Sequence, residues 1–181
     1  RLSLVGSEMC IRDRVSPERI TELTLSDISA RWPGTRTDVF TGLSAVLPRG
    51  GVAAVTGPSG AGKTTLVSVL LRFLDPRTGR YQLNDTDALT CLPMDLAGRI
   101  SWCPQEAHVF DSTLRANLLI ARPREDRPSD AELQSALERV GLGALAADIG
   151  LDERIGAGGG HLSGGQRQRL AVARTLLADA E

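Results

Sequence analysis

The chain has 181 residues, of which 41% are hydrophobic and 24% charged, and this composition is that of an ordinary globular protein long enough to bury a core. A formal net charge of −1 and an aromatic content of 3% argue against a nucleic-acid partner, because such a surface needs a basic face and aromatic platforms for bases. The longest apolar stretches fall short of the roughly 20 residues that cross a bilayer, so no membrane span is predicted within them.

The first 14 residues differ in character from the rest of the chain. Residues 4–14 resemble a translated adaptor sequence, and we predict that residues 1–14 are a non-native tail; the alternative is a short natural linker. Cys10, Cys91 and Cys103 lie far apart, without the spacing of a metal site or an even disulfide count, so reduced thiols are expected.

Residues 20–56 have the character of β structure. The partial alternation of Leu23, Leu25 and Ile28 predicts a strand, which a turn at 33–34 separates from a second strand over 43–47. The apolar run over 51–56 is typical of a buried strand, and it leads directly into a glycine-rich segment. Residues 66–71 then continue as an apolar helix.

The glycine-rich segment, GPSGAGKTT over 57–65, fits the phosphate-loop pattern of glycine, four residues, then Gly-Lys-Ser/Thr. Its Lys63 is the only lysine of the chain, and a compact ammonium on a flexible stem suits a position between phosphate oxygens. Positive φ angles at the glycines would let backbone N–H groups converge on a phosphate, and Thr64 would ligate Mg²⁺. The alternative is a glycine-rich turn that binds nothing. The predicted nucleotide-binding residues are Gly57, Ser59, Gly60, Ala61, Gly62, Lys63, Thr64 and Thr65.

The remainder of the chain becomes increasingly helical. Two sets of residues have the form of a capping box, Ser129 with Glu132 and Ser163 with Gln166, and each predicts a helix start. We expect, in order, a strand over 80–83, a helix over 92–99, a core strand over 100–103, a helix over 113–120 capped by Ser112, a helix from 130 to 140, a loop over 141–160 and a final helix over 163–178.

The sequence LSGGQ over 162–166, followed by RQRLAVAR, resembles the signature of ABC transporter ATPases. A serine hydroxyl and bare glycine N–H groups at a helix N-terminus suit an anion. The resemblance implies that Leu162, Ser163, Gly164, Gly165 and Gln166 bind the γ-phosphate of a nucleotide held by the opposite subunit, so that a second ABC ATPase domain is the partner. The alternative is that Ser163 merely caps its helix.

Two further segments match the same family. The sequence WCPQ over 102–105 resembles its Q-loop, which implies that Gln105 ligates Mg²⁺ or orients water and relays contact to a transmembrane partner; an exposed turn glutamine is the alternative. The sequence RWPG over 31–34 resembles its aromatic loop, which implies that Trp32 stacks on adenine; a hydrophobic plug is the alternative. His108 and His161 are expected to be solvated loop residues.

The resemblance extends to the exporter branch of the family. Residues 109–118 resemble the corresponding stretch of exporter ATPases, whereas Ala157 stands at an acidic position of the family's X-loop. Residues 156–162 and 175–181 resemble half-transporters that export cysteine or glutathione for cytochrome bd assembly. In the family, a strand ending in Asp-Glu follows the signature helix. We therefore expect an ATPase domain that is incomplete at its C-terminus and lacks the catalytic glutamate. Alone, it should bind nucleotide weakly or not at all and should not turn over ATP.

The expected fold is α/β: a RecA-like phosphate-loop core over 20–105 with an N-terminal antiparallel β part, a helical subdomain over 106–160 and the signature helix over 163–178. The expected function is that of the ATP-binding and hydrolysing domain of an ABC exporter, with ATP and Mg²⁺ as cofactors and Lys63, Gln105 and Ser163 as catalytic residues. It would act at the cytoplasmic face of the cell membrane, with a transmembrane domain fused upstream. The alternatives are a soluble ABC ATPase without transport and a phosphate-loop kinase.

Overall fold

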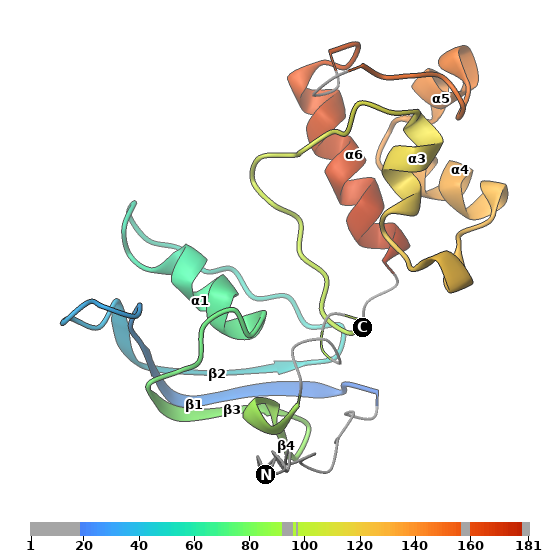
Figure 1. Ribbon diagram of the computed structural model, residues 1–181. Coiled ribbons are helices and arrows are strands. Elements are labelled where there is room, and N and C mark those ends of the chain that lie inside the picture. Colours follow the sequence, from blue (N-terminus) through green and yellow to red (C-terminus); the bar gives the residue numbers. More distant parts are fainter. Residues whose placement is uncertain (1–18, 92–95, 97, 157–159, 179–181) are drawn as a thin grey trace, which may run out of the picture. The chain divides into compact units, whose positions relative to one another are not determined.

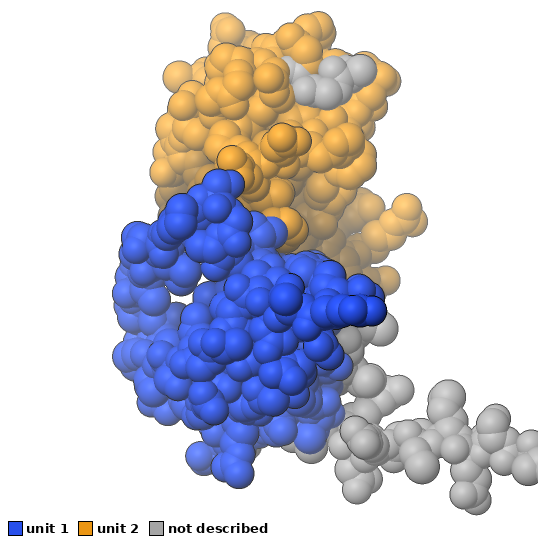
Figure 2. All heavy atoms as spheres, turned by 90° about the vertical axis from the view of Figure 1, so that its left-hand side faces the viewer, with its two compact units in different colours: residues 1–97 blue, residues 98–181 orange. Residues whose placement is uncertain are grey.

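The computed structural model describes residues 19–91, 96, 98–156 and 160–178 (Figure 1). The chain divides into two compact units, residues 1–97 and residues 98–181, which are coloured separately in Figure 2. The predicted tail over 1–14, most of the predicted helix over 92–99 and the X-loop residue Ala157 lie outside the described residues. The division that the sequence predicts after residue 105 stays a prediction.

The 1–97 unit is built on a four-stranded antiparallel sheet with the strand order β2-β1-β3-β4 (Figure 1). The strands are β1 (Glu22–Ala30), β2 (Phe40–Pro48), β3 (Thr78–Leu83) and β4 (Thr86–Asp87). A short 3₁₀ turn, η1 (Ala88–Thr90), follows β4, and Asp87 caps it by accepting a hydrogen bond from the Leu89 N–H. The N-terminal antiparallel β part that the sequence predicts is therefore confirmed.

A bulge in the middle of β1 interrupts both of its ladders. Asp27 has a φ of +53°, and the pairing register shifts between Leu25 and Ile28. On β3, Gly79 faces this bulge with a φ of +89°, and a Cβ there would lie 2.4 Å from the Asp27 carbonyl oxygen. Only glycine fits this position, because both the backbone conformation and the close approach exclude a side chain.

The helix α1 (Lys63–Leu70) supplies the second layer of this unit. Its buried face, formed by Leu66 and Val69, packs with the inward-facing residues of the sheet. The largest of those residues is Tyr81 on β3, which is fully buried and donates its hydroxyl to the Leu70 carbonyl at 3.1 Å. The core thus joins the helix that begins at the glycine-rich segment to the antiparallel sheet. Its buried members are Leu25, Ile28, Ala30, Leu66, Val69, Leu74, Tyr81, Leu83, Ala88, Cys91 and Leu96.

The 98–181 unit consists of helices around a core of its own. The elements are α3 (Leu114–Leu119), η2 (Arg124–Asp126), α4 (Asp130–Arg139), α5 (Gly143–Ile149) and α6 (Gly164–Leu177). The long helix α6 packs against α3 and α4 through Leu170, Ala173 and Leu177. None of the described helices in either unit is long and apolar enough to cross a bilayer.

The two predicted capping boxes are both confirmed. Ser129 accepts a hydrogen bond from the Glu132 N–H, and the Glu132 carboxylate accepts one from the Ser129 N–H at 2.8 Å. The same reciprocal pair joins Ser163 and Gln166 at the start of α6. Each box satisfies two backbone donors that a helix start would otherwise leave without partners.

Several local predictions were wrong. Residues 51–56 and 100–103 form no strand, and Val52 is 96% exposed. A buried-type apolar strand needs hydrogen-bonded neighbours on both edges, and the ladders among the described residues all belong to the antiparallel sheet. The predicted loop over 141–160 contains α5, because its alanines favour helix and Leu145 and Ile149 pack on the core. Thr113 rather than Ser112 caps α3.

Candidate nucleotide-binding site

The phosphate-loop segment has the backbone conformation that its glycines predict. Gly57, Gly60 and Gly62 have φ angles of +153°, +83° and +89°. The loop closes with the Ala61 N–H donating to the Pro58 carbonyl at 3.2 Å and then enters α1, for which Gly62 is the N-cap. No side chain caps this helix start, so its first backbone N–H groups face the loop. An anion placed there meets both these donors and the positive end of the helix dipole.

Gly62 is required at this helix start for two independent reasons. Its φ of +89° is strained for any residue with a side chain. A Cβ at this position would also lie 2.8 Å from the Cγ1 of Val39 and 3.2 Å from the Cδ1 of Phe40. Gly60 differs from it, since its φ is +83° but a Cβ there would have nothing within 4 Å.

The ammonium of Lys63 lies against its own loop. Its Nζ donates to the carbonyl oxygens of Gly57 and Pro58, each at 2.8 Å. An ammonium has three donors, so these two bonds leave one free to contact a further acceptor. The positive charge is therefore held at the loop, where phosphate oxygens would compete favourably with neutral carbonyls for it.

The donor set of this segment suits Mg²⁺ bound together with phosphates. Thr64 is exposed, and its hydroxyl takes part in no hydrogen bond among the described residues. Mg²⁺ commonly takes one or two protein oxygens plus phosphate and water oxygens, so one free hydroxyl beside the loop fits this role. No group of three or more His, Cys, Asp or Glu side chains that might hold a metal occurs in the described parts of the chain.

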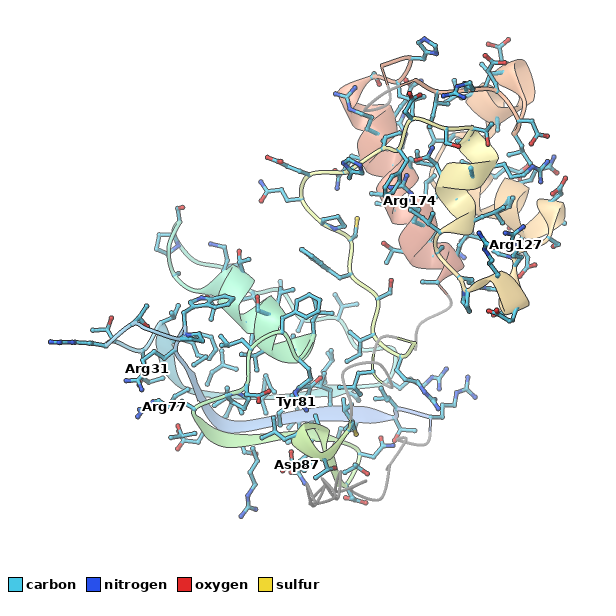
Figure 3. The ribbon with its side chains drawn as sticks, in the orientation of Figure 1. Arg31, Arg77, Tyr81, Asp87, Arg127 and Arg174 are labelled. Atoms are coloured by element: carbon cyan, nitrogen blue, oxygen red, sulfur yellow. The ribbon has the colours of Figure 1, made fainter. Side chains whose placement is uncertain are left out.

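Trp32 is connected directly to the helix that follows the phosphate loop. Its indole Nε1 donates to the Thr65 hydroxyl at 3.2 Å, across 33 positions of sequence. The ring is 40% exposed and borders an open cavity of about 570 Å³, which Arg72 and Phe73 also line. Two further lining residues, Arg31 and Arg77, lie at the same end of the sheet (Figure 3). The Trp32 ring is thus partly exposed while a hydrogen bond fixes its N–H edge.

The signature segment begins α6 in the 98–181 unit. Ser163 is exposed, and its hydroxyl accepts from the Gln166 N–H at 3.2 Å, which leaves the hydroxyl proton free to donate. Gly164 and Gly165 are exposed, and a Cβ on either would meet only the ends of arginine side chains, at 3.9 and 3.6 Å. Leu162 instead is buried in the core of the unit. The open face of this helix start therefore consists of Ser163 and two glycine N–H groups.

Gln105 is exposed, and the chain on each side of it is bound to α6. The Gln168 amide donates to the Pro104 carbonyl at 3.2 Å, and the Arg174 guanidinium donates to the His108 carbonyl. Gln105 lies between these two anchor points. The helix that starts at Ser163 thus also holds the segment that carries Gln105.

Arg174 belongs to a buried network that motif analysis did not find. Its guanidinium extends from α6 (Figure 3) and donates to both the backbone and the side-chain oxygen of Asn117 on α3, which is fully buried. Asn117 in turn bonds the Phe110 N–H at 2.9 Å and the Phe110 carbonyl at 3.0 Å. Burial lowers the pKa of Arg174. The available signal was a polar residue between Leu114 and Leu118 on the apolar face of α3.

The predicted site residues therefore occupy two separate units. The phosphate loop and Trp32 lie in the 1–97 unit, whereas Gln105 and the signature segment lie in the 98–181 unit. Within the first unit, the structure brings Trp32 to Thr65; within the second, it brings the chain around Gln105 to α6.

Comparison with known proteins agrees with a phosphate-loop ATPase class. The family model described as ABC transporter matches residues 40–181, and the chain belongs to this family. A solved structure described as a bacterial Atm1-family ABC exporter with ATP bound superposes with a TM-score of 0.80 at 31% identity, over 89% of this chain and 28% of that chain. The predicted α/β fold class is thereby confirmed.

The names of two curated relatives describe ATP-dependent transport systems. The chain is 41% identical, over 94% of its length, to the glutathione/L-cysteine transport system ATP-binding/permease protein CydC of Escherichia coli K12. It is 38% identical, over 85% of its length, to the ATP-dependent lipid A-core flippase of Xanthomonas oryzae pv. oryzae. The chain spans 28% and 26% of the lengths of these two relatives. The membership of the ABC transporter family that the sequence predicts is confirmed.

Proposed function

We propose that the chain binds MgATP at residues 57–65 as the nucleotide-binding part of a membrane exporter. The observation that carries the proposal is the phosphate loop itself, with Lys63 held at the loop and Gly62 fixed at the start of α1. The free hydroxyl of Thr64 would ligate Mg²⁺, and Trp32 would carry the adenine. Bound Mg²⁺ would neutralise the charge of the phosphates.

The signature segment of this chain would complete the nucleotide site of a second ABC ATPase domain, and the signature segment of that domain would complete the site of this chain. Ser163, Gly164 and Gly165 present one hydroxyl and two backbone N–H groups at a helix N-terminus, which suits the γ-phosphate of the partner's nucleotide. Gln105 would orient water or relay the nucleotide state to a transmembrane domain. Nucleotide binding would then close two domains on each other, and hydrolysis would release them.

The relatives also suggest a cellular role. Two curated relatives are named as transporters or flippases, and one name combines ATP-binding and permease functions. We infer a fused transmembrane domain, a position at the cytoplasmic face of the cell membrane, and a small thiol compound as one candidate cargo. None of the proposed site residues supplies a general base, so we expect this chain alone to bind ATP weakly and not to turn it over.

Calorimetric titration of the 181-residue chain with MgATP tests the nucleotide site. Lys63→Ala removes an ammonium that would contact phosphate. Loss of charge-assisted hydrogen bonds worth about 1.5–3 kcal/mol predicts a Kd that is roughly 10- to 150-fold weaker. Arg80→Ala is the charge-matched control, because Arg80 is exposed on β3 and should leave Kd unchanged. Equal affinity of the wild type and the Lys63 variant would refute the proposal.

A further inference from the structure

The hydrogen bond between Trp32 and Thr65 joins two parts of the proposed nucleotide site. Thr65 is 6% exposed in the first turn of α1, two positions after Lys63. Its hydroxyl accepts the indole N–H of Trp32 at 3.2 Å, while the indole ring itself stays 40% exposed. The buried threonine therefore fixes one edge of the ring, and the rest of the ring remains open to a ligand.

The Thr65 hydroxyl can bind the Trp32 indole and a phosphate oxygen at the same time. A hydroxyl has one proton to donate and two lone pairs that accept. The indole uses a lone pair, and the Thr65 hydroxyl donates to no acceptor among the residues that the structure describes. Its proton thus remains free for a phosphate oxygen. A phenylalanine ring in the place of Trp32 has no hydrogen-bond donor and would not form the bond.

The space next to the ring suits a planar base. Trp32 borders the open cavity of about 570 Å³, together with Arg72 and Phe73. A base stacked on the indole would extend into this cavity, while its phosphates lie at the start of α1. The position of the ring relative to the loop then decides whether base and phosphates are bound together.

We propose that Thr65 is a positioning residue that fixes where the Trp32 ring lies relative to the phosphate loop. It thereby couples recognition of the base to recognition of the phosphates. The inference rests on the proposed nucleotide site and adds a specificity device to it. Its consequence is that the chain prefers a nucleoside triphosphate over inorganic tripolyphosphate only while this hydrogen bond is intact.

A double-mutant cycle on the 181-residue chain tests the coupling. Trp32→Phe keeps an aromatic ring but removes the donor, and Thr65→Val removes the acceptor at nearly constant volume. With MgATP, we expect each variant to weaken Kd about 5- to 10-fold and the double variant to be no weaker than the poorer single variant. With Mg-tripolyphosphate, Trp32→Phe should leave Kd unchanged. Thr65→Ser keeps the hydroxyl and should bind MgATP as the wild type does. Thr86→Val, on β4, is the matched control and should leave the Kd unchanged.

Indole NMR of the ligand-free chain gives an independent readout. The chain has two tryptophans, so a Trp102→Phe variant assigns the two Nε1–H signals. We expect the Trp32 indole proton to exchange with water more slowly than that of Trp102, and Thr65→Val to remove this protection. Equal exchange rates, or additive effects in the cycle, would overturn the inference. If Trp32→Ala leaves MgATP binding unchanged, the proposed adenine platform fails as well; if it weakens binding while Thr65→Val does not, only the coupling fails.

Discussion

Replacing Arg174 by methionine should destabilise the 98–181 unit strongly. The guanidinium donates to two oxygens of the fully buried Asn117, and methionine fills similar space without donors. Each hydrogen bond from a charged donor contributes about 1.5 kcal/mol at the low end, so we expect a loss of about 3 kcal/mol. With an m-value of about 2 kcal/mol/M in urea, the unfolding midpoint should fall by about 1.5 M.

Urea unfolding followed by the fluorescence of Trp102 measures this loss, because Trp102 belongs to the same unit. A Trp32→Phe background removes the other tryptophan signal. The matched control is Arg169→Met on the same helix, where the side chain is exposed and a change below about 0.5 kcal/mol is expected. If the Arg174 variant unfolds within about 0.5 kcal/mol of this control, the network does not stabilise the unit as argued.

Three further changes test other parts of the structure. Gly62→Ala should lower the thermal midpoint of the 1–97 unit more than Gly60→Ala, because only the former adds a close contact, 2.8 Å from Val39, to a strained φ; equal midpoints would contradict this. Ser129→Ala should cost about 1 kcal/mol in urea unfolding. The Ser129 backbone and hydroxyl lower the pKa of Glu132 in the folded chain. The extra stability of the wild type over the Ser129 variant should therefore be present above the unfolded pKa of Glu132 and shrink as pH falls through its lower folded pKa. A stability difference that stays constant with pH would contradict the capping box. Burial raises the pKa of Tyr81, the only tyrosine of the chain. The stability that the buried neutral phenol contributes is therefore present below the unfolded pKa of tyrosine and is lost as pH rises. Tyrosinate absorbance should appear only with unfolding, and its appearance in the folded chain would refute this.

Local signals predicted the features that depend on a few neighbouring residues. Ser129 and Ser163 form complete capping boxes because the interacting atoms lie within one helical turn. The positive φ angles at Gly60 and Gly62 likewise follow from the loop sequence itself. These features need no knowledge of the remainder of the fold.

Features that depend on distant partners could not be predicted in this way. The runs over 51–56 and 100–103 are apolar enough for strands, but a strand needs neighbours, and none of the described strands pairs with them. The contacts of Trp32 with Thr65 and of Arg174 with Asn117 each join residues far apart in sequence. No spacing rule identifies such pairs, because the fold alone brings them together. The short helix α5 formed despite Gly143 because packing on the core outweighs glycine's low helix propensity.

We propose that the nucleotide site is shared between two copies of this type of domain. Lys63→Ala disables the phosphate loop, and Gly164→Asp places a carboxylate at the open start of α6. Neither variant alone can form a complete site, whereas a mixture can form one. Sedimentation of the mixture with MgATP should show ATP-dependent heterodimers that neither variant forms by itself. A mixture that sediments as the sum of its two components would contradict the shared nucleotide site.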